Sequence, residues 1–161
     1  MKRSFAYLLV FVMLVLPGCF QPKARELTGS GMDMFGPTTM RIHPLTRIVL
    51  PEPKSELEVR IELSDQMGDV GKGVGTLYFE LFDYEIAALG HKGPRVTLWN
   101  SDISTPALNK QYWDPITRTY LFHLGSPKPG LFKSGRKFVL DATMVFPNNT
   151  RLQDDLTLSV K

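Results

Sequence analysis

Apolar and polar residues alternate with a period of two over most of the chain after Met40, which is the pattern of half-buried β-strands. The clearest case is residues 57–63, where four aliphatic residues alternate with Glu58, Arg60 and Glu62. Strands that are buried on both faces of a parallel α/β sheet are apolar throughout, so the alternation favours antiparallel sheets with one solvated face.

The same alternation predicts further strands at residues 76–82, 116–124, 136–146 and 151–160, and weaker ones near 42–50 and 95–100. Within 116–124 it places Ile116 on the inner face, together with Tyr120, Phe122 and Leu124. One short helix is expected near 106–112, because Thr105 is a good N-cap residue and Pro106 suits the first turn. About seven strands and one short helix predict an all-β domain over residues 40–161, an immunoglobulin-like or transthyretin-like antiparallel β-sandwich.

The last hairpin permits a prediction of its register. Residues that lie directly opposite each other in an antiparallel pair share a face, and the apolar positions on both strands carry even numbers. The loop must therefore contain an odd number of residues. We predict the loop Asn148–Thr150, with Phe146 opposite Leu152 and Leu140 opposite Leu158. A bulge near residues 154–155 is the alternative that would reset the pairing.

The first 18 residues have the features of an export signal. Lys2 and Arg3 precede an uncharged apolar run of 12 residues, 5–16, which is shorter than the roughly 20 that a membrane-spanning helix needs. Residues 16–19, Leu-Pro-Gly-Cys, resemble a bacterial lipobox. The resemblance implies that Cys19 is acylated and becomes the new N-terminus, and two or more acyl chains hold a protein stably on a bilayer. An ordinary cleaved signal is the alternative.

These features predict three parts: a signal peptide at 1–18, the lipidated Cys19 with a tether over 19–39, and the domain at 40–161. The tether is rich in Pro, Gly, Ser and Thr and lacks periodicity. Phe20 follows the cysteine where Asp would favour inner-membrane retention, so the expected place is the outer membrane or a periplasm-facing site. With its only cysteine at the anchor, the domain has no internal disulfide.

The charge of the chain argues against a nucleic-acid partner. The 19 basic and 16 acidic residues give a net charge of +3. Removal of residues 1–18 would take away Lys2 and Arg3, leaving 17 against 16 and a net charge near +1. No basic face is clustered in the way that nucleic-acid binding requires.

Two resemblances bear on fold and location. The stretch 65–75, DQMGDVGKGVG, resembles the first crossover of carboxypeptidase-regulatory-like and transthyretin-like sandwiches through Asp65, Gly68 and Gly73. The stretches RIHPLTR, LYFELFDYE, YWDPITRTYLFHL and LQDDLTL resemble an uncharacterised group of bacterial lipoproteins of the planctomycete type. The first resemblance implies the sandwich fold, the second implies the lipid anchor as well as the fold, and neither implies a site.

No motif of cofactor or metal chemistry is complete in this sequence. The glycines around Lys72 lack the P-loop spacing and the hydroxyl that follows its lysine, so they indicate a turn. His43, His91 and His123 have no partner at metal-ligand spacing, and no metal or cofactor is predicted. A calcium site is the alternative for four loop carboxylates, which belong to Asp65, Asp69, Asp154 and Asp155.

Aromatic residues near predicted loops are the candidates for a binding surface: Trp113, Tyr112, Tyr84 and His91. Packing against the core, with Trp113 covering its open end, is the competing interpretation and the favoured one. The sequence favours a non-enzymatic binding or scaffolding module, held on the membrane by its anchor, with a protein or carbohydrate partner in the envelope. A small hydrolase or metal-dependent enzyme with a loop-built site is one alternative, and a purely structural spacer is another.

Overall fold

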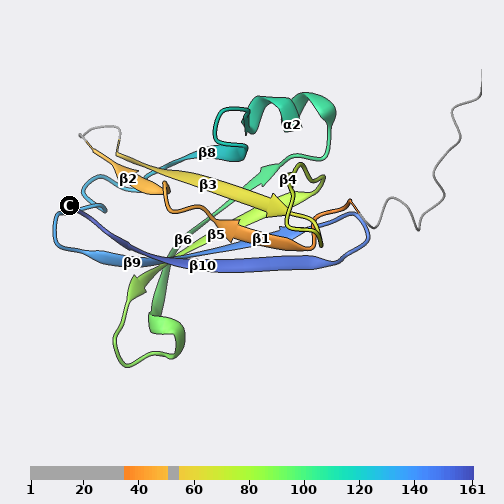
Figure 1. Ribbon diagram of the computed structural model, residues 1–161. Helices are drawn as coiled ribbons and strands as arrows, with labels where there is room; N and C mark the ends of the chain where they lie inside the picture. Colours follow the sequence, from red (N-terminus) through yellow and green to blue (C-terminus); the bar gives the residue numbers. More distant parts are fainter. Residues whose placement is uncertain (1–34, 51–54) are drawn as a thin grey trace, which may run out of the picture.

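A computed structural model describes residues 35–50 and 55–161, which form an all-β sandwich of two antiparallel sheets with one short helix (Figure 1). The expected fold class is therefore confirmed. The signal peptide, Cys19 and the tether up to residue 34 lie outside the described residues.

The first sheet has the strand order β1-β3-β8-β7, and β2 and β4 also pair with β3. Its strands are β1 (Thr39–Ile42), β2 (Arg47–Val49), β3 (Glu56–Ser64), β4 (Val70–Gly71), β7 (Trp113–Asp114) and β8 (Thr119–Gly125). The second sheet has the order β10-β9-β5-β6. Its strands are β5 (Thr76–Tyr84), β6 (Lys92–Asp102), β9 (Lys137–Val145) and β10 (Arg151–Ser159).

The core lies between the sheets and is built from the alternation seen in the sequence. In β3 every second residue from Leu57 to Leu63 is fully buried, while the charged residues between them lie on the outer face. The largest buried side chains are Tyr120, Phe79, Phe122 and Phe138. Phe79 of one sheet packs against Phe122 of the other with ring centroids 5.1 Å apart, so the two layers share one aromatic centre.

The predicted helix is present as α2 (Pro106–Tyr112) and begins as expected. The Thr105 side chain accepts a hydrogen bond from the Leu108 N–H at 3.3 Å, and Pro106 occupies the first turn. Tyr112, at the end of the helix, packs against Phe122 with ring centroids 4.7 Å apart. This contact fastens α2 to the first sheet.

The prediction that Ile116 lies on the inner face of a strand is wrong. Its side chain is 92% exposed, because β8 begins only at Thr119 and Ile116 lies in the turn between β7 and β8. The Asp114 carboxylate accepts hydrogen bonds from the N–H groups of Ile116 (3.0 Å) and Thr117 (3.4 Å). Asp side chains compete in this way with strand pairing for the backbone N–H groups that follow them.

The last hairpin has the predicted parity but a different register. Leu156 lies opposite Leu140 and Leu152 opposite Met144, two residues away from the predicted pairing, and no bulge interrupts the strands. The Asn149 N–H donates to Phe146 O, the Phe146 N–H donates to Thr150 O, and Asn149 has a φ of 64°. This is a three-residue loop of Pro147–Asn149, closed by a residue in the left-handed region.

Candidate functional site

The structure divides the four candidate aromatic residues between the two ends of the β5–β6 hairpin. Trp113, which follows Tyr112 at the end of α2, lines a hollow together with the segment that leads into β5, whereas Tyr84 ends β5 and His91 precedes β6. β5 has nine residues, which at about 3.3 Å each corresponds to about 30 Å. Two separate surfaces must therefore be considered.

We call the first surface the base: the end of the sandwich formed by residues 35–38, 65–75 and 104–118. A hollow of about 760 Å³ opens there between α2 and the segment that follows β4. It is lined by Lys72, Gly73, Val74, Ser104, Thr105, Pro106, Asn109, Lys110, Trp113 and Pro115. The lining is mainly apolar, and its two charged side chains are both lysines.

A buried polar network holds the floor of this hollow in place. The Tyr120 hydroxyl accepts from Gly73 N–H at 3.1 Å and lies 3.0 Å from Asn109 Oδ1 and 3.2 Å from Gly73 O. Its single proton can serve only one of these two acceptors. Asn109 Nδ2 donates to Gly73 O at 2.6 Å, and burial raises the pKa of Tyr120. The network joins α2, β8 and the loop before β5 into one rigid unit.

Trp113 both covers the core and faces the hollow. Its ring meets Tyr120 edge-on at 5.1 Å, and Lys72 Nζ lies 4.9 Å from its ring centroid on the side of the hollow. Among the described residues, no carboxylate pairs with Lys72 or Lys110. A lysine over an indole face is a cation–π contact, which leaves the ammonium free to bind an anion.

We call the second surface the tip: residues 84–91, at the turn of the β5–β6 hairpin, which projects from the sandwich (Figure 1). Tyr84 and His91 stack with ring centroids 4.9 Å apart. Beyond them Leu89 is 98% exposed and Ile86 is 81% exposed. Gly90 and His91 have φ values of 63° and 57°, so two successive left-handed residues shape the turn.

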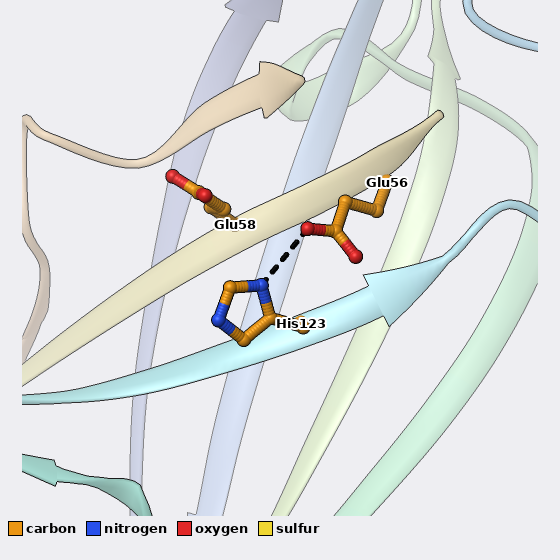
Figure 2. Close-up of side chains that lie close together, drawn as sticks. All are labelled: Glu56, Glu58 and His123. Atoms are coloured by element: carbon orange, nitrogen blue, oxygen red, sulfur yellow. Dashed lines mark hydrogen bonds and ion pairs between the residues drawn. The ribbon is translucent and has the colours of Figure 1, made fainter. Parts of the chain in front are cut away.

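A third group of side chains lies on the outer face of the first sheet (Figure 2). Strand pairing places Glu58 opposite His123, with Glu56 on the same face, and ligand atoms of the three lie within 4.8 Å of one another. His123 Nδ1 is 2.9 Å from Glu56 Oε1, and Arg47 donates to Glu58 Oε2 at 2.7 Å. His123 is 52% exposed. Each carboxylate already has a partner, so the group is accounted for as surface ion pairs.

The four aspartates weighed as a calcium site are not gathered into a comparable group within residues 35–50 and 55–161. Asp65 Oδ1 accepts from the N–H groups of Met67 (2.8 Å) and Asp69 (3.0 Å) and so shapes its own turn. Asp154 Oδ2 accepts from Ile42 N–H at 2.7 Å and links β10 to β1. Two of these carboxylates therefore already act as acceptors for backbone N–H groups.

No protein-family model matches this chain, and no curated protein matches it in sequence. Across the described part of the chain, no helix is both long enough and apolar enough to cross a bilayer.

Sequence reasoning found the aromatic residues of both surfaces but missed their aliphatic ones. Ile86 and Leu89 stand in the run Glu-Ile-Ala-Ala-Leu-Gly, and Val74 stands among glycines. Val74 and Ile86 carry even numbers, whereas the core positions of the strand at 76–82 are odd, so their parity was an available signal, because a strand buries apolar side chains only at alternate positions. Leu89 has the parity of the core positions, and the period gave no signal for it.

Proposed function

We propose that this protein is a lipid-anchored protein of the cell envelope whose β-sandwich is a non-enzymatic binding module, with the tip as its docking element for a protein partner. The observation that carries this proposal is the near-complete exposure of Leu89 and Ile86 at the end of a projecting hairpin. Exposed large apolar side chains mark interaction surfaces when they gather in one patch.

The arrangement of the two ends supports this assignment. Thr38 donates to the last residue of β3, Ser64, so the segment that leads back toward Cys19 enters the domain at the base. The tip lies at the opposite end of β5. A protein anchored through Cys19 can therefore present the tip away from the membrane. A purely structural spacer would have no need of exposed aliphatic side chains there.

The side chains of the tip suit a protein partner better than a sugar. Its two aliphatic side chains would add to the free energy of binding when a partner buries them, and a side chain of this size contributes about 1.5–3 kcal/mol when fully buried. The stacked Tyr84 and His91 rings beneath them add a firm aromatic base. A protein surface with an apolar recess matches this combination of side chains.

The test is site-specific photo-crosslinking in cells. A photoreactive residue in place of Leu89 is expected to give one adduct of defined mass with an envelope protein identified by mass spectrometry. Ile86→Ser in the same chain should weaken the purified complex at least about tenfold, because it removes one buried aliphatic contact. The matched control carries the photoreactive residue at Leu45, an exposed leucine in the turn between β1 and β2.

Adducts of equal yield at Leu45 and Leu89, or an adduct at Leu89 that Ile86→Ser leaves unchanged, would remove the tip from the proposal. Thermal unfolding of each variant shows whether the sandwich is intact. None of the three substituted residues, Leu45, Ile86 and Leu89, packs in the core, so the unfolding temperature should stay unchanged.

A further inference from the structure

We infer that the base is a membrane-contact surface, which rests against an anionic phospholipid bilayer and sets the orientation of the sandwich. The inference rests on the proposed lipid anchor and extends it: Cys19 would supply the attachment, and the base would supply the second, weaker contact. Its evidence is the combination of apolar, cationic and indole side chains at one end of the domain.

The chain enters the domain at this end. Pro37 Cγ would lie 3.3 Å from a Cβ placed on Gly73, so the first described residues run alongside the lining of the hollow. Phe35 follows Cys19 by 35 − 19 = 16 positions. This connection reaches at most about 55 Å when extended. A connection of that length does not by itself fix the orientation of the domain relative to the membrane. Contacts between the side chains of the base and the bilayer would fix it.

Exposed apolar side chains gather at this end. Among the described residues, the large hydrophobic side chains that are exposed here belong to Phe35, Met67, Val74 and Ile116. They come from four separate segments: the entry to β1, the β3–β4 turn, the loop before β5 and the β7–β8 turn. Side chains from several turns that meet at one end of a sandwich suit a flat, apolar partner such as the interface of a bilayer.

The two charged side chains on the wall of the hollow are both cations, Lys72 and Lys110, which is the sign that an anionic bilayer requires. The base as a whole is balanced in charge, since Asp65, Asp69 and Asp114 offset Lys72, Lys110 and Arg118. Two of these carboxylates have local partners: Asp65 Oδ1 accepts from the N–H groups of Met67 and Asp69, and Asp114 pairs with Arg60 at 2.7 Å. The attraction to an anionic headgroup is therefore local to the hollow.

Trp113 completes the pattern. It is half-buried, it lines the hollow and it carries Lys72 over its ring. Indole rings favour the headgroup level of a bilayer, because one part of the ring is apolar and the N–H is polar. The hydroxyl groups of Ser104 and Thr105 on the wall of the hollow offer hydrogen bonds to a phospholipid headgroup.

The experiment uses the lipidated protein on vesicles of phosphatidylcholine alone and on vesicles of an equal mixture with phosphatidylglycerol. The chain has two tryptophans, so Trp99→Phe leaves Trp113 as the only indole. Bromine-labelled lipid should quench Trp113 fluorescence on the mixed vesicles and much less on phosphatidylcholine. Amine-reactive labelling should be slowed on the mixed vesicles at Lys72 and Lys110 and unchanged at Lys128 and Lys133.

Charge-matched double variants test the cations directly. Each lysine near an anionic surface contributes about fivefold to the docking equilibrium constant, so Lys72→Gln with Lys110→Gln should reduce that constant about 25-fold and strongly reduce the quenching. Lys128→Gln with Lys133→Gln removes the same charge from the β8–β9 loop, which follows the end of β8 that pairs with Glu56. This control should quench like the parent protein.

Three outcomes would overturn the inference. They are unquenched Trp113 fluorescence on mixed vesicles, the same change in labelling rate between the two kinds of vesicle for all four lysines, and equal quenching in the two double variants. Binding of a soluble acidic polysaccharide that competes with the vesicles would instead assign the base to a glycan and would also overturn it. A protein that fails to float with either kind of vesicle contradicts the proposed anchor, so that failure is distinguishable from failure of the base.

Discussion

Single atoms decide what the glycines of the base can tolerate. A Cβ on Gly73 would lie 2.7 Å from Leu63 Cδ1, and a Cβ on Gly75 would collide with the carbonyl oxygen of Val145. Gly71, only a few residues earlier, has open space around the same position. The glycines after β4 thus serve close packing onto the core, and a phosphate-binding role is not needed to explain them.

We expect Gly75→Ala to lower the free energy of unfolding by about 1–3 kcal/mol, because a backbone oxygen cannot move aside as a flexible side chain can. Gly71→Ala is the matched control and should change stability by no more than about 0.5 kcal/mol. Urea unfolding followed by tryptophan fluorescence measures both. Equal destabilisation by the two substitutions would contradict the packing argument.

At the scale of elements, the short hairpin β7–β8 is held by polar contacts as well as by strand pairing. Arg60 on β3 donates to Asp114 at 2.7 Å and to Thr117 at 2.8 Å. The bond from Arg60 and then the one from the Thr117 hydroxyl lower the pKa of Asp114 to about 2 from its ordinary value of 3.8. The Asp114 carboxylate thus joins β3, through Arg60, to the β7–β8 turn that carries Ile116.

This pKa predicts a stability change in acid. A carboxyl whose pKa is depressed in the folded state stabilises the fold above its unfolded pKa, and the contribution disappears as the pH falls through the folded pKa. The melting temperature should therefore fall between about pH 4 and pH 2. Asp114→Asn should melt lower than the parent protein at pH 6 and show a smaller decline over that acid range. If the melting temperature falls equally with pH in both proteins, this role of Asp114 is contradicted.

Helix α2 and the last hairpin show how far local patterns determine an element. The cap of α2 was predictable, because Thr105 and Pro106 act on their own first turn. The parity of the β9–β10 pairing was also predictable from the apolar positions. Its register differs by two residues because the loop closes at Asn149 in the left-handed region, and Asn tolerates that region better than most residues.

At the scale of the whole molecule, the base and the tip lie at opposite ends of one strand pair. An anchor at Cys19 with a contact at the base would leave the tip as the outermost part of the protein. Because the base and the tip share no residue, a substitution in one surface should leave binding at the other unchanged.

The proposed lipid anchor predicts the effect of replacing Cys19. Cys19→Ala should abolish incorporation of labelled fatty acid, because the acyl acceptor is lost. The protein should also no longer be processed at residue 19, and therefore it should migrate as a larger species on a gel. Leu45→Ala, which leaves the lipobox unchanged, is the control. Unchanged labelling in Cys19→Ala would contradict lipidation at this residue.

The sequence by itself determined which side chains of the long strands β3, β5, β8, β9 and β10 face the core, where the helix begins and that the last loop has an odd length. These properties depend on residues a few positions apart, so a periodicity or a cap reveals them. Only the tertiary structure decided that residues 35–38, 65–75 and 104–118 meet at one end, that Ile116 is exposed and that His123 lies beside Glu56. Such neighbours are set by the pairing of distant strands and by competition for backbone N–H groups, and neither leaves a periodic trace in the chain.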